Sequence, residues 1–242
     1  MNHKLRDDVS RFLVHLTRAY GGYSAEDNLL SILRSKKLEA RNVHCLFHHK
    51  FKQYGFSKLL QDRFRTVCLT EAPIPQIRYL AMEIPKRRIR LQPYGLVFRK
   101  QSLMHQGASP AIYLNAKGTE LSNYLLREFQ RHFADHNTVK LLKKDYTDEA
   151  DSIIQYYALI NTISDRFDFS WEREWRFPGD LAFNYMDVYA IVAPNPRKFL
   201  LRCERRLTPK AYKLICRIPI VSPDWNYERI LHEFAVKLWN AD

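Results

Sequence analysis

The stretch FLVHLTRAYGGYSAEDNLLSILRSKKLEARN, residues 12–42, decides the fold class. Its apolar start carries His15 and Thr17 two residues apart, which alternation places on one face of a strand. A satisfied core histidine and a strand threonine fit the same pattern. Gly21-Gly22 follow at once, however, and glycines let a backbone approach a ligand closely. The stretch therefore predicts a strand whose end is either ordinary core or part of a binding site.

The rest of the chain alternates between helical and strand-like patterns. Ser24 or Asp27 is a candidate N-cap for a helix over 28–38. We predict further strands at 64–72, 94–100, 110–116, 169–179, 188–194 and 217–223. We predict further helices at 119–145, 149–161, 208–216 and about 224–240, a short helix ending at Gly107, and a basic helix or loop that includes 86–90. No Gly-, Ser- or Pro-rich linker divides the chain, so we expect a single α+β domain over 1–242 on which the final helix packs.

The charge balance indicates an anionic partner. The chain has 39 lysines and arginines against 26 aspartates and glutamates, a net charge of +13. Nucleic acid is the first candidate for such a partner, and a membrane surface is the second.

The cysteines and the N-terminus indicate the compartment. The four cysteines form no C-x-x-C pair, which disfavours a zinc ribbon and favours a reducing compartment. The N-terminus lacks the apolar core of a secretory signal, and no stretch approaches the roughly 20 apolar residues of a membrane helix. We therefore expect a cytoplasmic protein with no membrane partner. His44, His48 and His49 lack metal-ligand spacing, so we expect a solvated loop there and no bound metal.

The segment WEREWRFPGD, residues 171–180, places two carboxylates in one predicted strand. Alternation sends Glu172, Glu174 and Arg176 to one face and both tryptophans to the other, which should meet the core. Acids two residues apart along a strand lie about 7 Å from each other and perturb each other's pKa. An ion pair with Arg176 would instead be purely structural, so both interpretations stay open.

Several short motifs, taken in order, resemble those of ADP-ribosyltransferases. They are HLT at 15–17, NLLSILRSKKL at 28–38, CLTEAP at 68–73, YGLVFRK at 94–100, PAIYLN at 110–115 and EREWR at 172–176. More narrowly, the set resembles the DarT-type nucleic-acid modifiers and the AbiGi-like phage-resistance proteins, over residues 12–195. Lys37-Leu38 stands where those families usually have glycine-leucine.

The resemblance implies a fold and a cofactor-binding set. It implies two small antiparallel sheets around an NAD⁺ cleft, with flanking helices. His15 would then hydrogen-bond a ribose hydroxyl, and Thr17 would lie beside the nicotinamide or the ribose. Asn28 would contact NAD⁺ near the start of its helix, where backbone N–H groups also favour phosphate oxygens.

The resemblance also implies the catalytic residues. Glu174 would be the catalytic glutamate, with Glu172 two residues before it. Arg65 or Arg63 would hold the diphosphate or orient the acceptor, and the motif does not choose between them. Cleavage of the nicotinamide–ribose bond builds positive charge on the ribose, and a carboxylate stabilises that charge where it develops.

The expected reaction is therefore transfer of ADP-ribose to a base of nucleic acid, with single-stranded RNA ahead of DNA. Tyr20, Tyr23 and Tyr113 are candidates for base or nicotinamide stacking, although each would also fit an ordinary core or rim position. The resembled families imply a toxin of anti-phage defence, abortive infection or toxin–antitoxin type. They also imply an antitoxin and a chaperone as protein partners. Apolar residues of the final helix are candidates for that contact or for core packing.

Two rival functions belong to other classes. Arg127 and His132 match the R-x(4–6)-H pattern of HEPN-type RNases, a pattern that a chain this basic also produces by chance. A non-catalytic nucleic-acid-binding or antitoxin-like module is the second rival, because a fold does not guarantee activity.

Overall fold

The computed structural model describes residues 9–82, 90–115, 118–133, 148–164, 168 and 170–239. Most of the predicted basic segment at 86–90 and the predicted helical residues 134–145 lie outside these ranges. The described chain is mixed α+β, as predicted. It forms two compact units: the first comprises residues 1–38, 69–106 and 182–242, and the second comprises 39–68 and 107–181. The single domain over 1–242 stays a prediction, because compact units need not fold alone.

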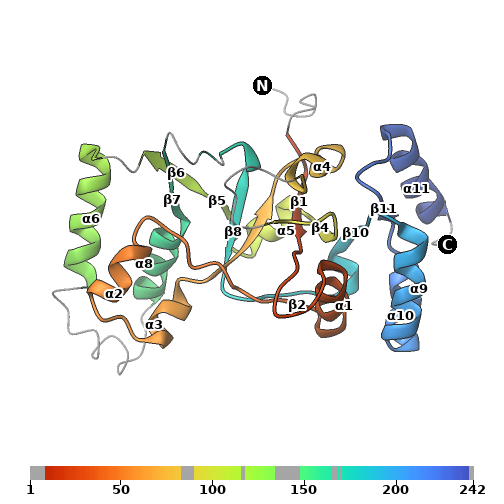
Figure 1. Cartoon of the computed structure of the whole chain (residues 1–242), viewed down its shortest axis with the longest axis horizontal. Coiled ribbons are helices and arrows are strands. Elements are labelled where there is room, and N and C mark those ends of the chain that lie inside the picture. Colours follow the sequence, from red (N-terminus) through yellow and green to blue (C-terminus); the bar gives the residue numbers. More distant parts are fainter. Residues whose placement is uncertain are drawn as a thin grey trace. The chain divides into compact units, whose positions relative to one another are not determined.

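The first unit combines a sheet with helices from three separate parts of the chain (Figure 1). Its strands are β1 (Phe12–Leu16), β2 (Lys37–Leu38), the end of β3 (Thr66–Thr70), β4 (Gly95–Arg99), β10 (Val188–Val192) and β11 (Ile220–Val221). Its helices are α1 (Ala25–Ser35), η2 (Ile74–Gln76), α4 (Ile77–Leu80), α5 (Lys100–His105), η4 (Tyr185–Asp187), α9 (Pro196–Arg206), α10 (Pro209–Ile215) and α11 (Tyr227–Trp239). The short strand β9 (Leu181–Ala182) lies at the boundary of the two units and pairs with β2.

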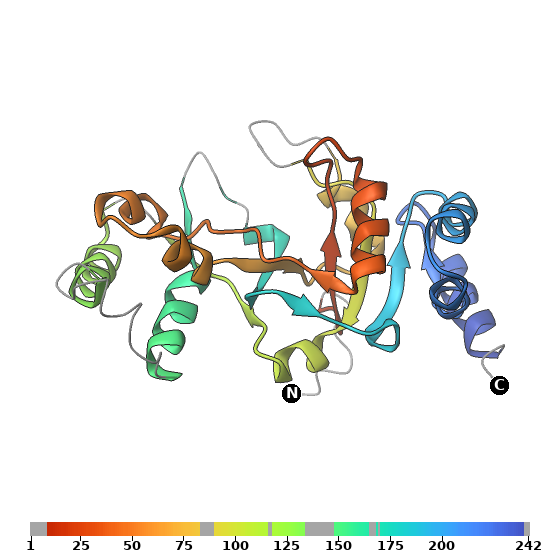
Figure 2. The same ribbon diagram turned by 90° about the horizontal axis from the view of Figure 1, so that it is seen from below.

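The sheet of the first unit has the order β11-β10-β4-β1-β3. β1 is antiparallel to β4 and to the end of β3, whereas β10 and β11 are parallel. The parallel pair follows from the connection, because α9 and α10 return the chain to the same end of the sheet before β11. Figure 2 shows α1 alongside β1 and the group α9, α10 and α11 beyond β10. The predicted purely antiparallel sheets are therefore wrong at this edge.

Local sequence explains the connection from β1 to α1. Gly21 and Gly22 have φ angles of 62° and 82°, and the backbone N–H groups of Tyr20 and Tyr23 each donate to the other's carbonyl oxygen at 3.0 and 3.1 Å. Positive φ at both central positions is the requirement of a type I′ turn, which glycine meets without strain. Ser24 then caps α1 by accepting the N–H of Asp27 at 3.1 Å.

Gly95 makes the close approach of β4 to β1 possible. It pairs with Leu16, and a Cβ added at this position would lie 2.2 Å from the carbonyl oxygen of His15. No side chain fits at that distance, so glycine is required for steric reasons. One core cluster of the first unit lies against one face of these strands, with Val14, Leu16 and Val97 buried there. The opposite face is also buried, through Leu13, Leu96 and Phe98.

The second unit packs helices around an aromatic core. Its helices are α2 (His48–Gln53), α3 (Lys58–Arg63), α6 (Glu120–Phe133), α8 (Asp148–Leu159) and η3 (Ser170–Glu172). Its strands are the start of β3, β5 (Ser109–Pro110), β6 (Ile112–Asn115), β7 (Ile160–Ile163) and β8 (Glu174–Pro178). Phe47 stacks on Phe129 with ring centroids 4.5 Å apart, and Phe51 stacks on Phe56 at 5.0 Å. Figure 1 shows α2, α3, α6 and α8 around this core.

Two predicted segments of the second unit differ in the structure. Helix α8 ends at Leu159, and the β-branched residues that follow form β7, which pairs in parallel with β6. A helical crossover between two strands gives this parallel arrangement, so the expectation of antiparallel sheets is wrong here as well. His48 and His49 begin α2 and are not part of a loop.

Candidate active site

Glu174 is the first residue of β8, and the chain before it is not a strand. Ser170–Glu172 form the 3-10 turn η3, and Arg173 takes a left-handed φ of 47°. Because of this turn, the alternation of side chains between two faces does not extend from β8 back to Trp171. Trp171 is 45% exposed, whereas Trp175 is buried. The predicted strand over 169–179 therefore holds only from 174 to 178, and the expected common face of Glu172 with Glu174 is wrong. Glu174 and Arg176 do share a face, as the period of two predicts.

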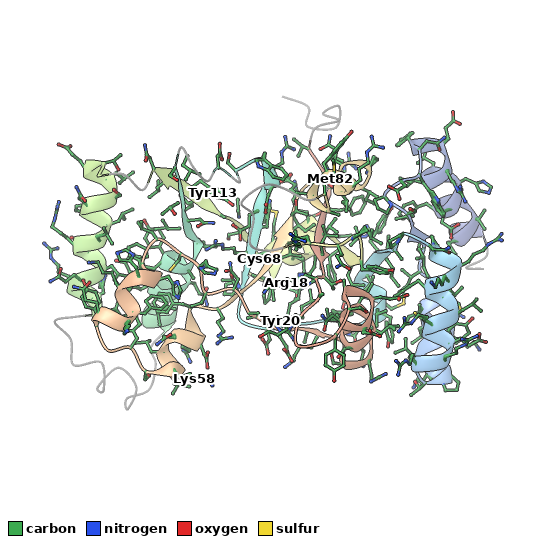
Figure 3. All side chains as sticks on the ribbon, in the orientation of Figure 1. Arg18, Tyr20, Lys58, Cys68, Met82 and Tyr113 are labelled. Atoms are coloured by element: carbon green, nitrogen blue, oxygen red, sulfur yellow. The ribbon has the colours of Figure 1, made fainter. Side chains whose placement is uncertain are left out.

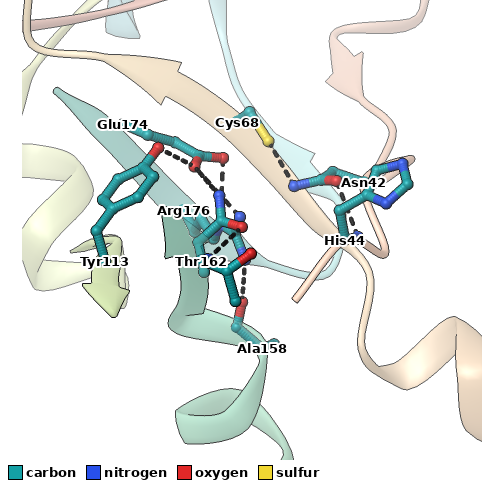
Figure 4. A network of polar contacts seen from close by, with 9 residues as sticks. Asn42, His44, Cys68, Tyr113, Ala158, Thr162, Glu174 and Arg176 are labelled. Atoms are coloured by element: carbon teal, nitrogen blue, oxygen red, sulfur yellow. Dashed lines mark hydrogen bonds and ion pairs between the residues drawn. The ribbon is translucent and has the colours of Figure 1, made fainter. Parts of the chain in front are cut away.

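The carboxylate of Glu174 accepts hydrogen bonds from Tyr113, Asn161 and Arg176 (Figure 4). The Cys68 thiol also donates to it. Oε2 accepts the hydroxyl of Tyr113 at 2.9 Å and the Nδ2 of Asn161 at 3.2 Å. The guanidinium of Arg176 donates from Nε to Oε1 at 3.1 Å and from Nη2 to Oε2 at 3.2 Å. These residues come from β6, β7 and β8 of the second unit. We call these four residues, together with Cys68, the Glu174 cluster.

Arg176 is the most enclosed member of the Glu174 cluster. Its side chain is 1% exposed, and its Nη1 also donates to the carbonyl oxygen of Ala158 at the end of α8. Burial opposes the positive charge, but the Glu174 carboxylate outweighs this and raises the pKa of Arg176 above its ordinary value. Removing one partner from such a pair costs about 3–5 kcal/mol, because the other charge stays buried and unpaired.

Glu174 stays ionised in this environment. Burial by itself would raise the pKa of the carboxyl group, but the charge of Arg176 and the hydrogen bonds from Arg176, Cys68 and Tyr113 lower it below the ordinary 4.5. The Glu174 side chain is 12% exposed, so the carboxylate is largely desolvated and still charged. A fixed negative charge of this kind is suited to stabilise positive charge that develops beside it.

The other members of the Glu174 cluster are held neutral. Burial and the adjacent Glu174 charge raise the pKa values of the Tyr113 hydroxyl and the Cys68 thiol. Both groups therefore act as hydrogen-bond donors at neutral pH. The Nδ2 of Asn42 lies 3.0 Å from the Cys68 sulfur, which extends the network toward the start of β3 (Figure 4).

The remaining predicted catalytic residues, Glu172, Arg63 and Arg65, lie in the second unit. Glu172 is half-buried in η3, and its charge contributes to the raised pKa of Tyr113. Arg63 is exposed at the end of α3. Arg65 forms an ion pair with Asp62, with 2.7 Å between Nε and Oδ1, and its carbonyl oxygen accepts the N–H of Gly179. The arginine that pairs with Glu174 is Arg176.

Three of the predicted cofactor-binding residues, His15, Thr17 and Asn28, lie in the first unit, whereas Arg63 lies in the second. The Thr17 hydroxyl lies 2.9 Å from the carbonyl oxygen of Ala25 and 3.0 Å from that of Tyr94. Asn28 donates from Nδ2 to the carbonyl oxygen of Arg18 at 2.7 Å. Both side chains therefore fasten the end of β1 to α1. His15 is half-buried on β1, opposite Leu96 of β4.

The structure thus forms two groups, one in each unit. His15, Thr17 and Asn28 lie together in the first unit, and the Glu174 cluster lies in the second. The convergence of the two groups on one NAD⁺ stays a prediction.

The tyrosine candidates have different surroundings. Tyr20 and Tyr23, at the turn after β1, are 53% and 65% exposed. The guanidinium carbon of Arg18 lies 5.5 Å from the Tyr20 ring centroid, so a cation stands over this ring (Figure 3). Tyr113 instead hydrogen-bonds Glu174, and its expected stacking role has no support in this arrangement.

The rival HEPN pattern falls on α6. Arg127 and His132 are five residues apart, which turns their side chains about 140° from each other around a helix. Arg127 is exposed, whereas the His132 Nδ1 lies 2.9 Å from the Tyr157 hydroxyl. The helix therefore does not bring the two side chains to one point. No group of three His, Cys, Asp or Glu side chains among the described residues is arranged to hold a metal ion.

Sequence reasoning missed part of the cluster. Asn161 is the last residue of the predicted helix over 149–161, and only the β-branched residues around it indicate a strand. In the sequence, Cys68 indicates a compartment and begins the CLTEAP motif, but neither signal predicts a contact with Glu174, and Asn42 belongs to no motif. Arg176 could be found, since alternation places it on the face of Glu174.

Comparison with known proteins gives no relative: no family model matches the chain, and neither the curated proteins nor the solved structures contain a match. Within the described ranges, none of the helices has the length and apolar character needed to cross a bilayer.

Proposed function

We propose that this chain is an ADP-ribosyltransferase that transfers ADP-ribose from NAD⁺ to a base of nucleic acid. We propose with it an ADP-ribosyltransferase-like fold that binds NAD⁺. The observation that carries the proposal is a desolvated carboxylate, Glu174, kept ionised by Arg176 and by neutral donors. The ordered motifs from HLT to EREWR support the same reaction.

The reaction makes one bond and breaks one. The bond between the ribose C1′ and the nicotinamide nitrogen breaks, and its electron pair leaves with nicotinamide. A nitrogen or oxygen of the acceptor base forms the new bond to C1′ and loses a proton to solvent. The ribose carries positive charge between these events, in a state of the kind found in glycoside cleavage.

The lowered pKa of Glu174 favours one of two possible roles for its carboxylate, electrostatic stabilisation over general base catalysis. A carboxylate with a pKa below the ordinary value is a weak proton acceptor, so it contributes little as a general base at neutral pH. It remains fully charged, however, and a fixed charge in a desolvated place needs no reorganisation when the ribose becomes positive. We therefore assign Glu174 to electrostatic stabilisation. Arg176 and Tyr113 are positioning residues that keep the carboxylate charged and oriented.

The first unit would supply contacts to NAD⁺. Asn28 uses its Nδ2 on Arg18, and among the described residues its Oδ1 accepts no hydrogen bond, so this oxygen is available to a ribose hydroxyl or a carboxamide. His15 would bind the ribose from β1. Thr17 uses its hydroxyl on main-chain oxygens, so its contribution to the site is the shape of the β1–α1 connection.

The acceptor follows from charge. A net charge of +13 attracts a phosphate backbone, and a base must leave its stack to reach the ribose. Single-stranded RNA is therefore the first acceptor to test and single-stranded DNA the second. A role in bacterial anti-phage defence, a cytoplasmic location, and an antitoxin or chaperone partner belong to the same proposal through the resembled families.

The test is incubation with NAD⁺ labelled in the adenylate part and with single-stranded RNA or DNA. We expect label on nucleic acid with wild type and at least about 100-fold less with Glu174→Gln, the scale of losing one electrostatic contact to a transition state. Glu128→Gln is the matched control, because it removes another ion-paired carboxylate of the second unit, 3.0 Å from Arg131. Equal labelling by wild type and Glu174→Gln, or no labelling by either folded protein, rejects the proposal.

A further inference from the structure

The first unit contains a groove whose lining residues include none of those assigned to catalysis. We call it the C-terminal groove; its volume is about 580 Å³, and it lies between the start of α9, β11 and one face of α11. The residues that matter here are Arg197, Trp225, Arg229, His232 and Lys237. Its volume falls within the roughly 300–1,000 Å³ of small-molecule sites, enough for part of an extended ligand.

The C-terminal groove is strongly basic. Residues 194–239 carry ten lysines and arginines against four acidic residues, so this segment holds a large share of the net charge of +13. Among the groove residues Glu233 is the acidic one, against Arg197, Arg229 and Lys237. Within the described ranges, neither Arg197 nor Arg229 forms an ion pair with a carboxylate, and both are exposed. Their guanidinium groups are therefore available to an anion.

An aromatic platform stands in the same groove. Trp225 is half-buried and packs against the core of the first unit, which fixes its ring. The guanidinium carbon of Arg229 lies 4.2 Å from the Trp225 ring centroid, so the cation rests on the indole. The Trp225 ring thereby orders the Arg229 guanidinium, and Arg229 is exposed to solvent. Ordered guanidinium planes and aromatic rings are the surfaces on which unstacked bases of single strands stack.

The start of α9 adds to the attraction for phosphate. Asn195 caps this helix by accepting the N–H of Lys198 at 3.0 Å, and Pro196 and Arg197 form its first turn. The positive end of a helix dipole favours anions. At the other wall, Lys237 donates to the carbonyl oxygen of Cys216 at 2.8 Å, which places its ammonium at the groove's edge.

From these observations we propose that the C-terminal groove binds a single strand of nucleic acid. A base stacks on the Trp225–Arg229 pair, and neighbouring phosphates contact Arg197, Arg229 and Lys237. The site holds the strand and takes no part in chemistry. This inference concerns a surface outside the proposed active site, and binding requires neither NAD⁺ nor Glu174.

The test measures binding without NAD⁺, by fluorescence anisotropy of a labelled single-stranded RNA of about 12 nucleotides, within the usual site sizes. Arg197→Gln/Arg229→Gln is expected to raise Kd at least about 10-fold near 0.1 M salt and to reduce the slope of log K against log salt by roughly 1.4, about 0.7 for each lost phosphate contact. The control is Lys210→Gln/Lys213→Gln, an equal charge change at two exposed positions of α10 outside the groove. It should change Kd by less than about 3-fold, a surface-charge effect screened by salt.

A second arm tests the platform. Trp225→Phe keeps an aromatic ring in the core and should weaken binding less than Trp225→Leu does. A duplex of the same sequence should bind more weakly than the single strand and show no difference between these variants, because its bases are stacked. The proposal is overturned by an unchanged Kd in the arginine double variant. Equal losses of affinity in both double variants would also overturn it, as would a duplex that binds as tightly as the single strand. The same holds if the arginine double variant loses binding to anionic lipid vesicles but keeps its affinity for RNA. Each binding measurement is repeated in the Glu174→Gln background. Strand binding is thereby tested separately from ADP-ribose transfer, and the failure of one proposal does not decide the other.

Discussion

Arg176 and Glu174 form a buried bidentate pair on one face of β8, with the Arg176 Nε 3.1 Å from Glu174 Oε1 and its Nη2 3.2 Å from Oε2. The sequence leaves two interpretations of Glu174 open, a catalytic carboxylate and a structural partner of Arg176, and this pair is compatible with both. Glu174 has the structural partner that alternation predicts, and the same partner keeps the carboxylate charged. Stability and the proposed catalysis can be separated by changing one or both residues.

The first prediction concerns the coupling within this pair. Glu174→Gln should lower the free energy of unfolding by about 3 kcal/mol, because the Arg176 charge stays buried without its partner. Glu174→Gln/Arg176→Met should recover much of that loss, since both charges are gone and Met fills a similar volume. Urea unfolding of the two variants measures this. The double variant should stay inactive in ADP-ribose transfer although it is folded. A double variant less stable than Glu174→Gln would show that the two side chains do not stabilise each other.

The second prediction concerns acid pH. Because the folded-state pKa of Glu174 lies below the ordinary 4.5, its charge contributes stability that is present above the unfolded pKa and lost as pH falls through the folded pKa. The stability difference between wild type and Glu174→Gln should therefore be constant from about pH 6 to 8 and shrink below about 4.5. Urea unfolding across this range is the measurement. A difference that grows on acidification would mean that the folded-state pKa is raised.

The third prediction concerns the Tyr113 hydroxyl. Tyr113→Phe removes a 2.9 Å hydrogen bond to Glu174 Oε2, so the pKa of Glu174 should rise toward its ordinary value. We expect a stability loss of about 1 kcal/mol and a fall in ADP-ribose transfer of about 10-fold. Tyr185→Phe is the control, because it deletes a hydroxyl bonded to the Leu33 carbonyl oxygen at 2.8 Å in the first unit. Equal activity losses in the two variants would show a general structural effect.

The fourth prediction concerns Gly95. Gly95→Ala places a Cβ 2.2 Å from the carbonyl oxygen of His15, so β4 or β1 must move. We expect a loss of at least about 2 kcal/mol, in the range of overpacked sites. Gly55→Ala meets open space and costs only the strain of a φ of 63°, about 1 kcal/mol. Thermal unfolding of the two variants gives the comparison, and a smaller loss at Gly95 would contradict the close strand approach.

The sequence predicts the elements of the first unit well, because their signals are local. Ser24, the apolar face of α1 and the glycine pair lie within a few residues of each other, and the structure confirms the strand, turn and helix in that order. Alternation likewise predicts that Glu174 and Arg176 share a face. Helix α9 is not among the predicted helices, although Asn195 and Pro196 form a recognisable N-terminus.

Other features depend on contacts that no local pattern encodes. The left-handed conformation of Arg173 displaces Trp171 from the core side and separates Glu172 from Glu174. Asn161 reaches Glu174 because β7 pairs with β6, a long-range parallel contact. The sequence predicts a stacking role for Tyr113, because no local pattern shows that its hydroxyl reaches Glu174 on another strand. Side-chain periodicity gives a residue's face but not its partner on another strand.

The most direct measurement is mass spectrometry of RNA and DNA from cells that express the wild-type chain or Glu174→Gln at equal levels. The proposed reaction predicts nucleosides that carry one added ADP-ribose with the wild type, and none with Glu174→Gln. Nucleic acid without ADP-ribose in both samples, or with equal amounts in both, would contradict the assignment of Glu174 as the residue on which transfer depends.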